Sequence, residues 1–175
     1  MPCLFCAIAE RQVEASFVYE DGNVLAFMDI HPVNAGHILV IPRHHFASLS
    51  DLPEAIGAHL FIVSQRLAEA IRRSSVRCEA ILLTLADGPA AGQEVPHVHL
   101  HVIPRFTGDS YRISAESSTP ARAELDAVAL EIARLGQFGL PLVSVPDRTA
   151  ATLSAWRMPV LSGGVRGSVV QYRHE

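Results

Sequence analysis

Residues 97–103 decide the fold: they read His97-Val98-His99-Leu100-His101-Val102-Ile103. Three histidines alternate with apolar residues, and strict alternation is typical of a half-buried strand. Side chains on a strand point to opposite faces in turn, so the imidazoles share one face and lie about 7 Å apart along it. Packing explains a lone buried histidine well, but it explains three at a period of two poorly. The stretch therefore predicts a strand whose polar face carries chemistry.

The composition limits the class of protein. The chain has 175 residues, of which 49% are hydrophobic, and a formal net charge of −4. That length suits one domain with an appendage, and a dedicated nucleic-acid binder would be basic. No run of about 18 apolar residues predicts a membrane span, and no N-terminal pattern predicts a signal peptide. Few cysteines fit a reducing compartment. We expect a cytoplasmic protein that binds neither nucleic acid nor membrane.

Short strands and two helices are predicted around the histidine stretch. The strands fall at 16–19, 24–28, 37–41 and 80–85, and the turn at 20–23 makes a hairpin of the first two. Apolar residues at three- and four-residue steps predict a helix from Pro53 to about Arg73, with the proline in its first position. A second helix is predicted over 120–135, with Thr119 as its cap.

Two further segments have chemical potential. Cys3 and Cys6 have the spacing of a zinc half-site, although a redox pair or two plain buried thiols remain alternatives. The loop 86–94 is rich in small residues, and its glycines allow the backbone to approach a ligand closely.

With these motifs in place, the chain resembles the histidine-triad (HIT) superfamily, whose His-φ-His-φ-His-φ-φ signature residues 97–103 match. Residues 19–30 resemble the first hairpin of that family, 36–43 its next strand and 92–95 the lead into the triad. The similarity covers about residues 3–135. It implies an α+β fold with a five-stranded antiparallel meander sheet, one long helix packed on it and a second, C-terminal helix, in a homodimer.

The resemblance also implies domain bounds. They place a HIT domain at 1–135, with a zinc-knuckle N-terminus at 1–10. The remaining residues, 136–175, form a C-terminal extension whose structure the sequence does not predict.

The resemblance assigns the histidines their roles. His99, the middle one, is expected to attack the α-phosphorus of a purine (adenosine) nucleotide and to form a nucleotidyl-histidine that water resolves. A neutral imidazole near pH 7 has one bare nitrogen for this attack. His101 is expected to contact the phosphate and help the leaving group. His37 matches a supporting histidine, although a strand-start residue satisfied by backbone is the simpler alternative.

The resemblance also places the nucleotide. Asp29 matches a carboxylate that accepts from the ribose hydroxyls, with a turn cap as the alternative. Phe27 and Ile30 are expected near the base, or else in plain core.

The loop before the triad is expected to bind the phosphate. Gln93 matches a side chain that contacts the phosphate, and the backbone of Glu94 and Val95 can present N–H groups to it. Family members often carry Asn seven residues before the glutamine, where this chain has Ala86. That departure puts one phosphate or ribose contact in doubt.

The order of Cys3, Cys6, His45 and His97 resembles the zinc-containing bacterial branch. Four such ligands make a closed structural Zn²⁺ site. His44 is the neighbouring alternative to His45, which the spacing from Pro42 favours.

Three functions follow from the sequence. The first is a nucleotide phosphoramidase or dinucleoside polyphosphate hydrolase, which needs no metal at the phosphate although Mg²⁺ can accompany the substrate. The second is a metallohydrolase whose catalytic zinc is held by His97, His99 and His101. The third is a nucleotide-binding scaffold with little turnover. A uridylyltransferase-like activity is disfavoured, because that branch has Gln where His101 stands.

Overall fold

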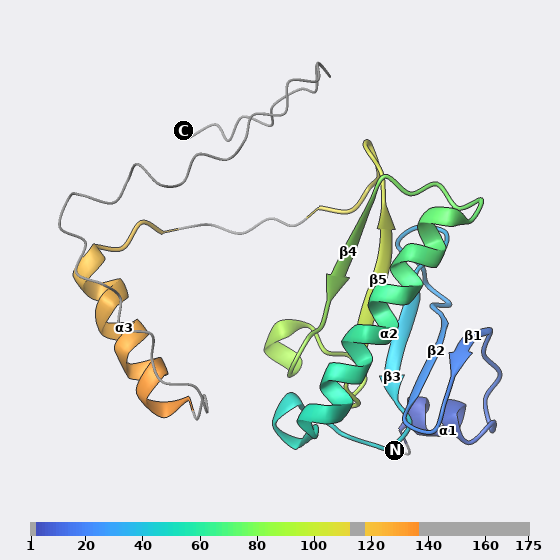
Figure 1. Ribbon diagram of the computed structural model, residues 1–175, viewed down its shortest axis with the longest axis horizontal. Coiled ribbons are helices and arrows are strands. Elements are labelled where there is room, and N and C mark those ends of the chain that lie inside the picture. Colours follow the sequence, from blue (N-terminus) through green and yellow to red (C-terminus); the bar gives the residue numbers. More distant parts are fainter. Residues whose placement is uncertain (1–2, 113–117, 137–175) are drawn as a thin grey trace. The chain divides into compact units, whose positions relative to one another are not determined.

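The computed structural model describes residues 3–112 and 118–136, in two units that span Met1–Ala115 and Glu116–Glu175 (Figure 1). The first unit runs in the order α1 (Leu4–Ala9), β1 (Phe17–Glu20), β2 (Val24–Met28), β3 (Ile38–Pro42), α2 (Glu54–Arg73), β4 (Ala80–Thr84) and β5 (Leu100–Arg105). Short 3-10 turns occupy Leu49–Asp51 and Pro89–Ala91. The second unit contains α3 (Arg122–Leu135). Apart from its first residue, the predicted extension at 136–175 lies outside the described residues.

The five strands form one antiparallel sheet, as the α+β prediction requires. Their order is β1-β2-β3-β5-β4, so the meander holds from β1 to β3 and β5 then pairs with both β3 and β4. The chain reaches the edge strand β4 before it returns through the sheet as β5. This insertion places the histidine segment beside β3, in the middle of the sheet.

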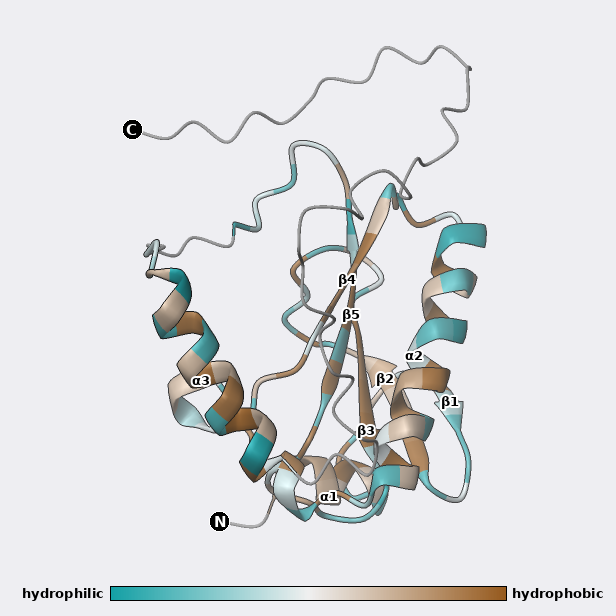
Figure 2. Cartoon of the chain, turned by 60° about the vertical axis from the view of Figure 1, so that its left-hand side comes forward, coloured by the Kyte–Doolittle hydropathy of each residue, from teal (hydrophilic) through white to brown (hydrophobic). Residues whose placement is uncertain are grey.

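The middle strands β2 and β3 are buried on both faces of the sheet, against different helices. Residues of β2 and β3 alternate between two cores because successive side chains point to opposite faces. Val24, Ala26 and Val40 pack in the core that includes α2, whereas Leu25, Phe27 and Ile41 pack in the core that includes α1. Figure 2 shows hydrophobic colours along β3 and hydrophilic colours on the last turns of α2. The long helix thus covers one face, and the short one leaves room for a site on the other.

The histidine strand begins later than the alternation predicts. β5 starts at Leu100, so the prediction that His97 and His99 lie within the strand is wrong. Pro96 has no N–H to give to a ladder, and the Val98 amide donates instead to the carbonyl of Phe46 (2.7 Å). The alternation of faces nevertheless persists, because Val98 and Val102 are buried in the α2 core.

Helix starts also differ from the predictions. Pro53 is the N-cap of α2, not its first residue. Ala121 is the N-cap of α3, so the predicted capping by Thr119 is wrong. The helix α1 was not predicted, because six residues are too few for an apolar period to stand out. No helix within the described ranges combines the length and apolarity that crossing a bilayer needs.

Candidate active site and metal-binding residues

A cleft of about 480 Å³ lies on the sheet face opposite α2. It brings together residues from the end of β2, the start of β3, the loop before β5 and α1. Most of the residues that the sequence singled out line it: Phe27, Asp29, Ile30, His37, Glu94, Val95, His99 and His101. The exceptions are Gln93 and the four predicted metal ligands.

His99 presents a bare nitrogen. Its Nδ1 lies 2.7 Å from the carbonyl oxygen of His97. A carbonyl can only accept, so Nδ1 carries the proton and Nε2 of the neutral ring is unprotonated. The ring is 5% exposed, and the edge-to-face ring of Phe5, with centroids 5.2 Å apart, holds it in place. A buried, oriented imidazole with one free lone pair has the properties of a nucleophile.

His37 and His101 form a pair of neutral rings. His37 Nε2 lies 2.9 Å from His101 Nδ1. Burial, with smaller contributions from His99 and His37, lowers the pKa of His101 to about 4. Burial also lowers the pKa of His37, and the nearby Asp29 carboxylate only partly opposes this. Both rings are therefore uncharged near pH 7, when they can donate and accept hydrogen bonds in turn.

Asp29 joins the two ends of the loop between β2 and β3. Its amide donates to the carbonyl of His37 (3.0 Å), and its Oδ1 accepts from the amide of His31 (2.8 Å). Its Oδ2 lies 3.3 Å from His37 Nδ1. The carboxylate therefore caps the turn, as the simpler alternative has it, and at the same time lines the cleft.

Gln93 supports the loop before β5 from behind. Its Oε1 accepts from the amide of Gly88 (2.8 Å), and its Nε2 donates to the carbonyl of Ala47 (2.9 Å). The cleft is bordered instead by Gly92, whose φ of +87° suits glycine and whose Cβ position is open. The loop thus offers backbone to the cleft, while the Gln93 side chain shapes it.

Sequence reasoning missed one wall of the cleft. Leu4, Phe5 and Ile8 of α1 line it, together with Val13. The signal was the spacing of Phe5 and Ile8, which places both side chains on one face of a helix. Cys3 and Cys6, which lie beside and between them, carry a metal-binding spacing that indicates nothing about the apolar residues.

The four predicted metal ligands form a separate cluster. Cys3 Sγ and Cys6 Sγ lie 3.5 and 3.7 Å from His97 Nδ1, and Cys6 Sγ lies 3.4 Å from His45 Nδ1. In a tetrahedral zinc site, sulfur and nitrogen ligands are about 3.6 Å apart. The donor atoms of all four residues lie within 4.8 Å of one another. The set fits a tetrahedral metal ion, and it includes His45, not His44.

The surroundings of these ligands support that fit. His97 Nε2 donates to the carbonyl of Pro42 (2.9 Å), which leaves Nδ1 bare and aimed at the thiols. Metal-ligating histidines regularly use their other nitrogen in this way. Burial, followed by the neighbouring Cys3 thiol, raises the pKa of Cys6 to about 11. A cation among the four donors would reverse that direction, because it binds thiolates.

The three histidines of the triad do not form one metal site. His97 joins the cysteines, and the Nδ1 of His99 is occupied by a backbone carbonyl. The catalytic-zinc hypothesis requires their nitrogens to converge, which this division opposes. Asp29, His37 and His101 also lie close together, but the His37 and His101 rings are hydrogen-bonded to each other.

The HIT domain family model matches residues 10–108. A HIT family protein from Bacillus anthracis has a crystal structure that superposes with a TM-score of 0.74 at 37% identity, covering 78% of this chain and 98% of that one. A zinc-bound histidine triad family protein from Mycobacterium smegmatis gives a TM-score of 0.62 at 38% identity, covering 78% and 99%.

A relative with a named activity is more distant. The adenosine 5'-monophosphoramidase of Saccharomyces cerevisiae is 34% identical over 103 residues, which are 59% of this chain and 62% of the yeast protein.

Proposed function

The chain belongs to the HIT family, and from that premise we propose that it hydrolyses a purine nucleotide at its α-phosphate through a nucleotidyl-His99 intermediate. The observation that carries this proposal is the hydrogen bond from His99 Nδ1 to the carbonyl of His97, which leaves Nε2 free inside the cleft. The activity named for the yeast relative supports it.

The reaction consists of two displacements. First, His99 Nε2 attacks phosphorus, the bond from phosphorus to the leaving group breaks, and the leaving group takes the electron pair and a proton that the solvent supplies. Second, water attacks the same phosphorus and returns a proton to the solvent, the phosphorus–nitrogen bond breaks with its electron pair staying on Nε2, and the nucleoside monophosphate departs from a neutral His99. Splitting the reaction lowers each barrier. The His101 N–H and the backbone of the 92–95 loop would stabilise the phosphate charge.

The charges around the cleft favour an amine over a polyphosphate as the leaving group. Three carboxylates line it, those of Glu14, Asp29 and Glu94, and no arginine of the described residues does. The sequence also contains no lysine. A polyphosphate leaving group carries several negative charges that this lining would repel unless Mg²⁺ accompanied it, whereas an amine leaves neutral or protonated. We therefore propose a nucleoside phosphoramidate as substrate, with Asp29 accepting from the ribose and Phe27 and Ile30 beside the base.

A trapping experiment tests the proposal. The protein is mixed with adenosine 5'-phosphoramidate or diadenosine tetraphosphate, quenched without acid and analysed by mass spectrometry. We expect an adenylyl group on His99, formed faster from the phosphoramidate, and none in His99→Asn. A protein that binds both nucleotides without forming this adduct would be a scaffold and would refute the proposal. Faster reaction with the tetraphosphate would refute the choice of substrate.

We propose further that the ion held by Cys3, Cys6, His45 and His97 is structural Zn²⁺. Two thiolates and two imidazoles make a closed set for zinc, with no open position for substrate. The proposal rests on the distances within the cluster and on the zinc-bound relative. Reduced thiols are needed, which suits the cytoplasm. Elemental analysis of the folded protein tests the proposal, and one zinc per chain is expected.

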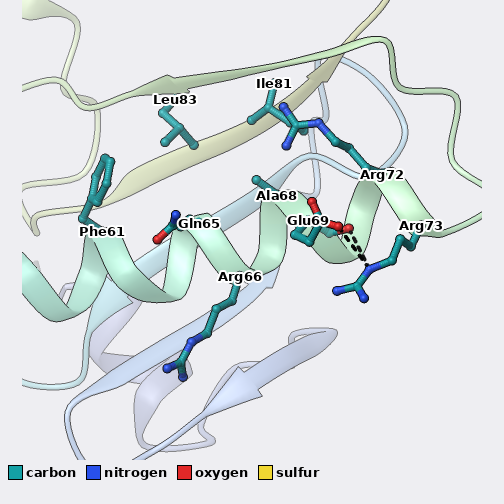
Figure 3. A pocket seen from close by; sticks show the side chains of 9 residues that line it. All are labelled: Phe61, Gln65, Arg66, Ala68, Glu69, Arg72, Arg73, Ile81 and Leu83. Atoms are coloured by element: carbon teal, nitrogen blue, oxygen red, sulfur yellow. Dashed lines mark hydrogen bonds and ion pairs between the residues drawn. The ribbon is translucent and has the colours of Figure 1, made fainter.

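We also propose that two chains associate through β4 and the groove beside it. In Figure 3 the side chains of Phe61, Ala68 and Arg72 rise from α2 toward Ile81 and Leu83 of β4. Phe61 is 58% exposed, and β4 is an edge strand whose backbone invites a partner. A second copy can cover both features by two-fold symmetry.

Sedimentation tests this association. Phe61→Glu should convert the dimer to a monomer, whereas Ile62→Glu, on the same helix but outside the groove, should leave it intact. A wild-type chain that sediments as a monomer would refute the association.

A further inference from the structure

The loop between β2 and β3 holds both Asp29 and His37 at its ends, and its tip is fastened to the far end of β5. The side-chain nitrogen of Asn34, Nδ2, donates to the carbonyl of Pro104 (2.8 Å) and to Oδ2 of Asp109 (2.9 Å). The loop backbone is also tightly packed at Gly36, because a Cβ there would lie only 2.9 Å from Val76 Cγ1. The loop therefore has one well-defined position.

Asp109 is the anchor of this fastening. The carboxylate is only 4% exposed, and Arg105 binds it with both its Nε and its Nη2, the latter at 2.8 Å. These hydrogen bonds from Arg105, and next the one from Asn34, hold the pKa of Asp109 well below its usual range. Asp109 thus accepts from the loop at any physiological pH. Neither Asn34 nor Asp109 lines the cleft, so neither can contact a substrate there.

The fastened loop acts on His37. The Asn34 carbonyl accepts from the amide of His37 (3.1 Å), and the amide of Val33 donates to His37 Nδ1 (3.3 Å). A nitrogen that accepts from an amide must be bare, so the proton of the neutral His37 ring is on Nε2. Nε2 then donates to His101 Nδ1, and the proton of His101 is left on Nε2.

We propose that Asn34 and Asp109 are positioning residues that hold the Val33 amide against His37 and so fix the tautomers of His37 and His101. The inference rests on the proposed function, because it gives the fixed N–H of His101 a role toward the leaving group. Tautomers of metal-free catalytic histidines are set by the partner of the other nitrogen, and here that partner is a loop amide.

Releasing the loop has a defined consequence. Three groups face the His37 ring: the Val33 amide, the Asp29 carboxylate at 3.3 Å from the same Nδ1, and His101, with His99 beyond it. The amide favours a bare Nδ1, whereas the carboxylate favours a protonated one. When the loop is free, Nδ1 gains a proton and pairs with Asp29, the pKa of His37 rises, and the pair loses its defined direction.

The experiment uses Asn34→Ala in the full chain, with Asn23→Ala as the matched control in the exposed turn between β1 and β2. Nitrogen-15 NMR of the histidine rings reports which nitrogen carries the proton, without any turnover. We expect the wild-type chain to show a bare His37 Nδ1 and Asn34→Ala a protonated one, with a higher pKa of His37. We expect kcat for the phosphoramidate to fall about 10- to 100-fold with KM nearly unchanged, and Asn23→Ala to match the wild type.

The outcomes separate cleanly. If Asn34→Ala lowers kcat but leaves the His37 nitrogens unchanged, or if Asn23→Ala gives the same changes, the proposal is overturned. If Asn34→Ala does not fold, Val33→Pro removes the amide hydrogen itself and must protonate His37 Nδ1. If the wild-type chain turns over no nucleotide, the proposed function fails, while the NMR result still decides whether the loop sets the tautomer.

Discussion

His97 and His99 are two residues apart, yet opposite nitrogens of their rings are bare. His97 donates through Nε2 to the carbonyl of Pro42, so its Nδ1 faces the thiols. His99 donates through Nδ1 to the carbonyl of His97, so its Nε2 is available in the cleft. Backbone carbonyls thus select which nitrogen each ring offers. His97 of the cysteine–histidine cluster and His99 of the cleft therefore come from one short segment and differ in which ring nitrogen a backbone carbonyl takes up.

Removing the proposed nucleophile should affect the cleft alone, and it is the largest effect we expect. His99→Asn should lower turnover by about 10⁴-fold or more, as loss of a nucleophile does in other covalent hydrolases. Nucleotide affinity and zinc content should stay at wild-type values, because the cluster of Cys3, Cys6, His45 and His97 is untouched. Single-turnover kinetics and equilibrium binding measure the two quantities. Retained turnover would remove His99 from the mechanism.

Removing the proposed zinc ion should affect the cysteine–histidine cluster alone. Chelation is expected to lower the free energy of unfolding by about 4 kcal/mol when free zinc had been about a thousandfold above its Kd. Cys6→Ser should reproduce much of that loss, and Cys78→Ser, at a cysteine outside the cluster, should not. Urea unfolding with and without chelator measures it. Equal stability in both conditions would mean that the cluster holds no ion.

The sequence accounts for the faces of the histidine segment better than for its partners. The alternation of Val98, Leu100 and Val102 follows from covalent geometry, which works over two residues, so the split between core and cleft could be predicted. The carbonyl of Pro42 that orients His97 is 55 residues away, and no local pattern encodes it. The orientation of Gln93 could not be predicted for the same reason, because its side chain donates to the carbonyl of Ala47 in another loop. The orientations of His97 and Gln93 are therefore set by partners that are distant in the sequence and that no local pattern reveals.

The wall that α1 supplies is a second example. Cys3 and Cys6 carried a spacing that the sequence could reveal, but Phe5 and Ile8 form part of the cleft only because α1 packs beneath β2 and β3. Phe5, which lies between Cys3 and Cys6 in the sequence, thus contacts the His99 ring. The segment that contains α1 thus contributes residues both to the cysteine–histidine cluster and to the cleft.

The stability of the protein at low pH should report the burial of His101 in the cleft. An exposed imidazole titrates near 6.5, whereas burial lowers the pKa of His101 to about 4. Between these values only the unfolded chain binds the proton, so the free energy of unfolding should fall as the pH drops from about 6.5 to about 4, and should not depend on this group above that range. His101→Gln should flatten the slope and the exposed His44→Gln should not. Urea unfolding across this pH range decides, and an unchanged slope in His101→Gln would contradict the burial argument.

The smallest effect we expect tests whether α1 connects the two sites. Phe5→Leu removes the edge-to-face contacts with the His97 and His99 rings while keeping most of the apolar volume. Such aromatic pairs contribute about 0.5–1.5 kcal/mol, so turnover should fall about two- to tenfold and zinc affinity should weaken slightly. Phe17→Leu is the matched control, since Phe17 packs on Phe27 and not on a histidine. If both variants behave alike, α1 only packs on the core, and the cluster of Cys3, Cys6, His45 and His97 acts independently of the cleft.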